Sequence, residues 1–264
     1  MTTIDIPAIA GTELPQLDMN VSRVSLRCAL AAVLPHVGDT DSTHRIRLAL
    51  ADERTLIVMA TSSYTAITAR AHVIDVIWSS EMPVIDIEPR SAREILSVFA
   101  PPADKDERSV WEHNGFRVRV TDTEVTVIES AGMLDDLDRV LTVPRLRSTP
   151  ADDKAPRFPD LARLVLRNLL TQPSVQDRAR VSVKRLEPFI KSAKAYGIPD
   201  LTLRTFETVH GLIVHVSEDA VGIVSGSERA PDAEAEQAEN LADLWQRQLA
   251  PLFQPITKEG ADSE

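Results

Sequence analysis

The sequence has only one cysteine, Cys28, among its 264 residues. A single thiol excludes an intrachain disulfide framework and a cysteine-based zinc site within one chain, and it is typical of a protein from a reducing compartment. No stretch of about 18 apolar residues occurs, and the first 17 residues have neither a basic residue nor the apolar run of a signal peptide. We therefore expect a soluble, cytoplasmic protein without a membrane span.

Signatures of catalysis are also missing. No GxSxG, P-loop or GxGxxG pattern occurs. His210 and His215 are five apart in a strand pattern, so they point to opposite faces and cannot share a metal ion. Asp135, Asp136 and Asp138 form an acidic cluster for which a solvated turn is a better interpretation than a cation site. We expect no enzymatic activity, no metal and no cofactor, and Cys28 is expected to pack in a helix.

The excess of negative charge is concentrated at one end. The net charge is −11, and residues 228–264 hold nine acidic against three basic residues, a contribution of −6. The body of the chain is therefore only mildly acidic. Overall acidity argues against nucleic-acid binding by bulk attraction, but it does not exclude a local basic surface.

What the sequence does contain is one pattern of elements that occurs three times, namely a strand, an amphipathic helix and three strands. For each copy, the predicted ranges are given in the order strand, helix, strand, strand, strand. The first copy has Met19–Val21, Ser22–Leu34, Arg45–Leu50, Leu56–Ala60 and Ala66–Val76. The second has Val84–Ile87, Pro89–Ala100, Ser109–Glu112, Phe116–Val120 and Glu124–Glu129, with a hairpin turn at Asn114-Gly115. The third has Arg180–Val183, Pro188–Tyr196, Leu201–Phe206, Leu212–Val216 and Ala220–Val224.

A connector, Met133–Gln176, separates the second and third copies. It contains a predicted strand at Val140–Pro144 and a short helix in "FPDLARLVLRNLL". The domain boundaries that follow are a leader at 1–17, a domain of two βαβββ repeats plus connector at 18–176, a half-domain at 177–227 and an acidic tail at 228–264. The fold class is α+β, with antiparallel sheets backed by helices on one face.

Three passages resemble the bacterial DNA polymerase III β sliding clamp family. "LRCALAAVLPHVG" followed by "IRLALADERTLIVMATSSYTAITAR" resembles the family's helix, strand and turn, "VIDIEPRSAREIL" resembles the start of its second half-domain, and "FPDLARLVL" resembles its inter-domain connector. The similarity covers roughly residues 18–227. The chain departs from the family at Ser62 and Ser63, at Thr65 and at Ala66, and it shows three repeats where the family has six per subunit.

The resemblance implies a DNA-encircling ring with helices on its inner wall and basic residues on those helices. The residues that this implies for DNA binding are Arg23, Arg27, Arg90, Arg93, Lys184, Arg185, Lys191 and Lys194. An ordinary solvated helix face is the alternative interpretation of the same charges. The family's peptide pocket implies a partner site at Thr61, Ser63, Tyr64, Thr65 and Ala66.

The acidic tail contains the string Gln248-Leu249-Ala250-Pro251-Leu252-Phe253. Gln248, Leu249, Leu252 and Phe253 match the type of peptide with which polymerases and repair proteins bind a clamp pocket. The alternative is that these residues form the apolar stripe of a helix packed on the chain's own body, which Pro251 disfavours.

Two functions remain open. The first is a DNA sliding-clamp-like processivity factor that encircles or tracks duplex DNA without sequence specificity and recruits a DNA polymerase. The second is a regulator that forms no ring and binds a full-length sliding clamp through its tail. A ring requires a homo-oligomer joined through unpaired sheet edges, which would be a tetramer for three repeats or a trimer if a fourth repeat is hidden.

Overall fold

A computed structural model of the chain describes residues 16–79, 84–129, 139–146, 157–170, 181–205 and 211–225. The chain divides into two units, residues 1–226 and residues 227–264. All described residues lie in the first part, so the tail and its Gln248–Phe253 string lie outside them.

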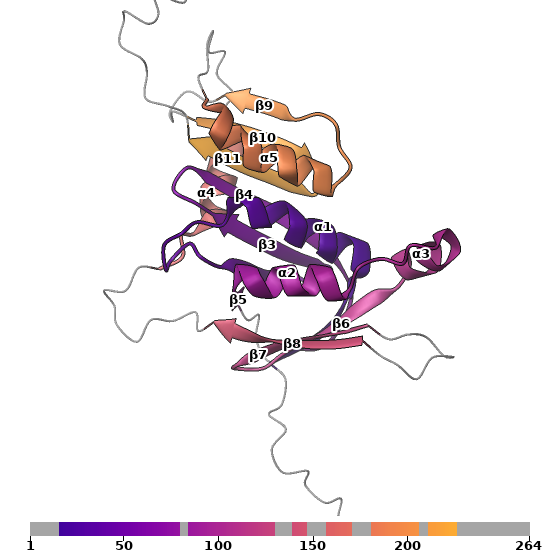
Figure 1. The fold of residues 1–264 in the computed structure, drawn as a ribbon. Helices are drawn as coiled ribbons and strands as arrows, with labels where there is room; N and C mark the ends of the chain where they lie inside the picture. Colours follow the sequence, from indigo (N-terminus) through magenta and orange to yellow (C-terminus); the bar gives the residue numbers. More distant parts are fainter. Residues whose placement is uncertain are drawn as a thin grey trace, which may run out of the picture. The chain divides into compact units, whose positions relative to one another are not determined.

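The first repeat has the predicted order of elements (Figure 1). Its elements are β1 (Leu17–Ser22), α1 (Arg23–Val33), the 3-10 turn η1 (Leu34–His36), β2 (Ile46–Asp52), β3 (Thr55–Thr61) and β4 (Thr65–Ser79). Ser22 begins the helix because its hydroxyl accepts a hydrogen bond from the amide of Ser25. The three strands follow one another through short antiparallel hairpins.

The second repeat has the elements β5 (Val84–Ile87), α2 (Pro89–Val98), α3 (Lys105–Glu112), β6 (Gly115–Val120), β7 (Glu124–Glu129) and β8 (Arg139–Leu146). The predicted strand Ser109–Glu112 is wrong, because these residues belong to helix α3. The Asn114-Gly115 hairpin is wrong for the same reason, since Asn114 joins a helix to β6. The strand that was assigned to the connector is β8, the last strand of this repeat.

The connector contains α4 (Leu161–Leu170), and the third repeat has the elements α5 (Val183–Ala195), β9 (Thr202–Thr205), β10 (Gly211–Ser217) and β11 (Ala220–Ser225). The short helix in the connector is confirmed as α4. The strand predicted up to Val183 is wrong, because helix α5 begins at that residue. The helix also starts earlier than predicted, and Pro188 lies inside it.

The strands are joined in the order β1-β6-β7-β8-β5-β2-β3-β4-β11-β10-β9, with an additional pairing between β1 and β4. Every pairing is antiparallel. The first two repeats thus form a closed circuit of eight strands, and β11 extends it by pairing with Thr65–Ala69 of β4. The α+β fold with antiparallel strands is confirmed.

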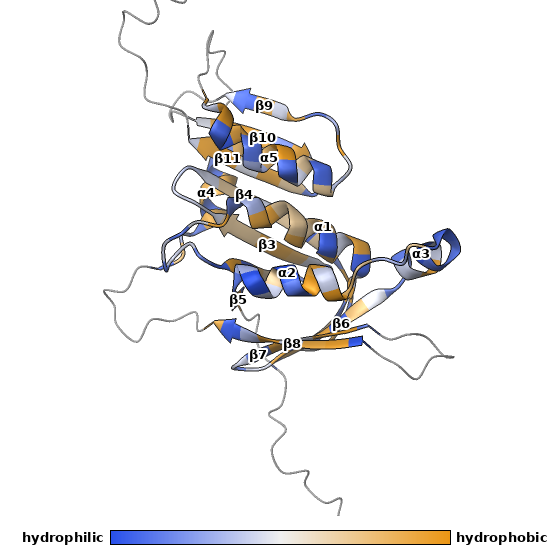
Figure 2. Ribbon diagram, viewed as in Figure 1, coloured by the Kyte–Doolittle hydropathy of each residue, from blue (hydrophilic) through white to orange (hydrophobic). Residues whose placement is uncertain are grey.

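Alternation along the strands separates two apolar faces. In β3, Leu56, Val58 and Ala60 face the main core under the helices, whereas Met59 contributes to a smaller cluster with Phe158. Because successive strand residues point to opposite faces, this cluster lies on the other side of the sheet, where it receives α4. Figure 2 shows hydrophobic residues along the strands, whereas the helices are mixed hydrophobic and hydrophilic. No helix among the described residues is long and apolar enough to cross a membrane.

Candidate functional site

Helices α1, α2 and α5 form one layer, in which α1 lies between the other two (Figure 1). Each helix buries the stripe that faces the strands, for example Leu26 and Leu30 of α1 and Phe189 of α5. The opposite stripe is exposed, and it is the surface that the sequence predicted to bind DNA.

Arg23 of α1 does not reach that surface. Its side chain is 6% exposed and forms an ion pair with Glu129 at 3.0 Å. Its Nε also donates to the carbonyl of Gly115 at 3.1 Å, and its guanidinium lies 5.5 Å from the ring centroid of Phe116. Burial lowers the pKa of Arg23 and the Glu129 carboxylate opposes that shift. Arg23 therefore joins α1 to the second repeat.

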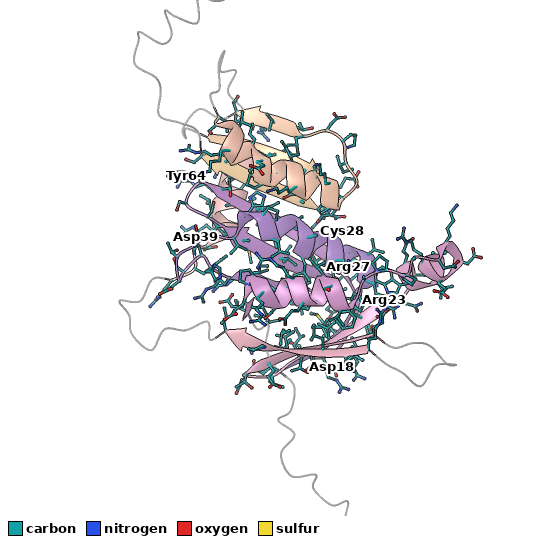
Figure 3. All side chains as sticks on the ribbon, viewed as in Figure 1. Asp18, Arg23, Arg27, Cys28, Asp39 and Tyr64 are labelled. Atoms are coloured by element: carbon teal, nitrogen blue, oxygen red, sulfur yellow. The ribbon has the colours of Figure 1, made fainter. Side chains whose placement is uncertain are left out.

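Arg27 also makes contacts within the protein. Its Nη1 donates to the carbonyls of Leu96 and Phe99, at 2.6 and 2.8 Å, where helix α2 ends. A basic side chain satisfies carbonyls there that have no partner within the helix. Figure 3 shows Arg23, Arg27 and Cys28 along α1. Burial raises the pKa of the Cys28 thiol, which disfavours the thiolate and agrees with the expected packing role.

The exposed cations lie on the two flanking helices. On α2 they are Arg90 and Arg93, and on α5 they are Lys184, Lys191 and Lys194. The α5 lysines are spaced so that they share one face of the helix. Ion pairs join Arg90 to Glu94 at 3.0 Å and Lys191 to Glu187 at 2.8 Å.

The predicted partner site is the turn between β3 and β4, and it adjoins the third repeat. The hydroxyl of Ser62 accepts hydrogen bonds from the amides of Tyr64 and Thr65 and so fixes the turn. Tyr64, which is labelled in Figure 3, is 54% exposed, and the Arg185 guanidinium lies 4.2 Å from its ring centroid. Arg185 also donates to the carbonyl of Ser225 at 2.9 Å. The predicted DNA-binding residue Arg185 therefore lies beside the predicted partner site.

Of the other three residues of the predicted partner site, Ser63 is exposed, whereas Thr61 and Ala66 are buried around the same turn. Thr61 donates its hydroxyl to the carbonyl of Thr65, and Ala66 packs against Phe158 and Leu161 of the connector. Phe158 is also covered by the guanidinium of Arg47, 4.4 Å from its ring centroid. The connector is thus anchored to the outer face of β3 and β4.

Helix α4 exposes apolar side chains where a solvated face would be polar. Leu161 and Val165 face the strands and are buried, whereas Leu164, Leu166 and Leu170 are 42%, 57% and 76% exposed. Leu166 and Leu170 are four residues apart and therefore share one side of the helix, and we call these two leucines the α4 surface. Its signal in the sequence is the run "LARLVLRNLL", which has more leucines than one buried stripe needs and was not among the predicted sites.

No candidate metal site is found in the described part of the chain. No group of three His, Cys, Asp or Glu side chains gathers among those residues. A narrow gap beneath α1 and α2 is lined by aliphatic side chains alone, among them Leu26, Ile85 and Val125. Such a gap belongs to the core, because it offers no polar group to orient a ligand.

Solved structures with a similar fold are sliding clamps. The DNA polymerase III beta subunit of Thermotoga maritima superposes with a TM-score of 0.55 at 7% identity, over 83% of this chain and 67% of that chain. The Helicobacter pylori beta clamp bound to a DNA ligase peptide superposes with a TM-score of 0.54 at 12% identity, over 84% and 68%. The proliferating cellular nuclear antigen of Entamoeba histolytica superposes with a TM-score of 0.52 at 8% identity, over 81% of this chain and 100% of that chain.

No protein-family model matches the sequence, and no curated protein does. The similarity is therefore one of fold, and at these identities it shows the fold alone. This chain has a divergent clamp-like fold, built from two complete βαβββ repeats and a third that lacks its first strand among the described residues.

Proposed function

We propose that this protein is a sliding-clamp-like scaffold that lies along duplex DNA without sequence preference and catalyses no reaction itself. The observation that carries the proposal is the helix layer, in which exposed cations of α2 and α5 flank an α1 that has no exposed charged side chain. A surface of this kind attracts phosphates through charge, and it reads no base sequence.

The balance of charge on this layer differs in sign from that of the chain. Five exposed cations on α2 and α5 stand against three carboxylates, Glu88, Glu94 and Glu187, which leaves a net charge of +2. The whole chain has −11. Arg23, Arg27 and Arg185 are left out of the proposed interface because Arg23 is buried and the other two are only partly exposed.

Salt dependence of binding tests the proposal. We expect weak binding to two unrelated duplexes of equal length with equal affinity, because phosphate contacts are independent of sequence. Each lost phosphate contact should reduce the slope of log affinity against log salt by about 0.9. Lys191→Glu with Lys194→Glu should therefore weaken binding by about ten-fold or more at low salt, as measured by fluorescence anisotropy.

The matched control reverses two exposed cations outside α2 and α5. Arg54→Glu with Lys105→Glu changes the net charge by the same amount and should leave binding within about two-fold of the parent. If both pairs weaken binding equally, the helix layer is not the interface. Unchanged affinity in the lysine pair would contradict the proposal directly.

For a partner protein, we propose the α4 surface together with the turn at Tyr64 as the docking site. The exposed leucines of α4 and the half-exposed Tyr64 ring supply apolar area beside a positively charged group, Arg185. An apolar peptide from a DNA polymerase fits this chemistry. Leu166→Asp would remove its binding without changing affinity for DNA, which separates the two surfaces.

The second candidate function remains the regulator that binds a separate full-length clamp through its tail. It is favoured by the Gln-Leu-x-x-Leu-Phe string and by the absence of a complete fourth half-domain from the described residues. The two functions differ in their requirements. A regulator of this kind needs its last ~20 residues and a clamp partner, but neither self-association nor DNA.

A further inference from the structure

The first two repeats are related by a pseudo-two-fold axis that the pairing pattern makes visible. Strand β1 pairs with β4 and β6, and β5 pairs in the same way with β8 and β2. Matching hydrogen bonds fix the correspondence, because the amide of Val73 donates to the carbonyl of Arg54 and that of Arg145 donates to the carbonyl of Thr123. Strand β8 is therefore the counterpart of β4.

The two counterparts differ in what covers their outer edge. In β4, the backbone N–H and C=O groups at the outer edge form hydrogen bonds with β11. One of them is the 2.7 Å hydrogen bond from the amide of Arg70 to the carbonyl of Asp219. With Val73 matched to Arg145, Arg70 of β4 corresponds to Thr142 of β8. The outward-facing position two residues before Arg70 corresponds to Val140. Strand β8 pairs with β7 along Arg139–Pro144, and it pairs with β5 only at Arg145 and Leu146. No described strand covers the edge at Val140 and Thr142.

Helices α1 and α2 differ in the same way, because only α1 is covered by a described helix on its outer side. The flank of α1 is covered by α5 of the third repeat, whereas α2, its counterpart, leaves Val98 39% exposed and has no described helix on its outer side. In β8, Val140 is 56% exposed. One lateral face of the double repeat is thus covered by a third repeat, and the equivalent face, formed by β8 and α2, is not.

We propose that the β8 edge binds the β8 edge of a second copy of this chain, in an antiparallel pair around a two-fold axis. On the covered face, β4 pairs with β11, and each of these strands is the last strand of its repeat. We therefore expect the β8 edge to pair with another last strand. Among the described residues the last strands are β4, β8 and β11, and β4 and β11 are already paired with each other. The remaining free strand of that kind is β8 itself, so a symmetric contact follows.

Backbone geometry selects the register. The amide of Arg145 donates toward β7, so the odd-numbered residues of β8 bond to β7 and the even-numbered ones face the free edge. An axis at Leu141 places Val140 opposite Thr142 of the second copy, and each such pair exchanges two hydrogen bonds. Pro144 has no N–H to donate, which ends the ladder and limits it to one partner rather than a growing sheet.

Cross-linking in the full chain tests this register. In a Cys28→Ser background, Val140→Cys mixed with Thr142→Cys should give a disulfide-linked dimer, because hydrogen-bonded antiparallel pairs place their Cα atoms about 5.5 Å apart. Either variant alone should give little, because two copies of one position lie about 8 Å apart in this register. Equal cross-linking in all three samples, or none in the mixture, would overturn the proposal.

A second variant tests the edge without cysteines. Thr142→Pro removes an N–H from the free edge and should raise the dimer dissociation constant at least ten-fold by analytical ultracentrifugation. Leu203→Lys changes an exposed residue on the β9 edge and should leave the dimer dissociation constant unchanged. A parent protein that is monomeric at tens of micromolar, or a dimer lost through Leu203→Lys alone, would refute the β8 contact. None of these results depends on DNA binding.

Discussion

Buried polar residues join the repeats, and His36 is one of them. Its imidazole is fully buried at the end of α1, lies edge-on to Phe189 with ring centroids 4.4 Å apart, and shares a 3.0 Å hydrogen bond with the hydroxyl of Ser192. Ser192 in turn donates to the carbonyl of Ala32. The contact joins the first repeat to α5 of the third.

The pH dependence of stability should report on His36. Burial lowers its pKa from about 6.5 to about 3 in the folded chain. The unfolded chain therefore binds a proton below pH 6.5 that the folded chain excludes, so stability falls as the pH drops from 6.5 toward 3. By pH 5 the loss should be about 2 kcal/mol, and His36→Gln should lose that much less in urea titrations at pH 7 and pH 5. Parallel losses in both proteins would contradict this assignment.

Arg23 should behave as a structural residue and not as a DNA contact. Arg23→Ala leaves the buried Glu129 with Arg139 as its remaining cation, at 2.6 Å, and removes a bond to Gly115. The loss of one partner from a buried ion pair costs about 3 kcal/mol, which urea unfolding would measure. Lys194→Ala, on the exposed face of α5, should change stability by less than about 0.5 kcal/mol. Equal stability of both variants would place Arg23 at the surface.

At the scale of elements, the alternation of apolar and polar residues predicts most of the strands. The residue that caps helix α3 also has a sequence signal, but the prediction did not use it. The alternation in β2, β3 and β4 fixes those strands because hairpin pairing is local. Helix α3 was predicted as a strand at Ser109–Glu112, although Asp104 caps it and accepts bonds from the amides of Asp106 and Glu107. The pairing of β4 with β11 and the burial of Arg23 depend on contacts distant in sequence, so no local pattern gives them.

Gly222 should be essential to the junction between β4 and β11. A Cβ at this position would lie 2.5 Å from the carbonyl oxygen of Ala66 and 2.5 Å from the ring of Phe189. Gly222→Ala should therefore destabilise the junction by about 1–3 kcal/mol. Hydrogen exchange should rise for the amides of β11 and of Thr65–Ala69 but not for β2, whereas Val221→Ala should leave the junction protected. Unchanged exchange in Gly222→Ala would mean that the two strands do not approach this closely.

At the scale of the whole molecule, the distribution of charge restricts how DNA can approach. Residues 228–264 contribute −6 to the net charge of −11, which leaves −5 on residues 1–227, while the exposed face of α2 and α5 has +2. An acidic body with one basic face repels a polyanion from most directions and admits it at that face. If the proposed function is correct, binding to DNA should therefore be weak and salt-sensitive.

The tail offers the last prediction, that Gln248–Phe253 is a docking peptide and not part of the chain's own core. Pro251 breaks a helix that would otherwise explain the leucine spacing, and an acidic spacer separates the string from the repeats. Burial of Leu252 and Phe253 in a pocket should contribute about 1.5–3 kcal/mol each before ordering costs are subtracted. Replacing both by alanine should abolish binding to a clamp pocket, on a neighbouring subunit or on a separate full-length clamp, in a pull-down or by calorimetry. The melting temperature should stay nearly unchanged, because side chains that contact only a partner do not stabilise the isolated chain. A drop of several degrees, together with no clamp binding by the parent protein, would instead make these residues core.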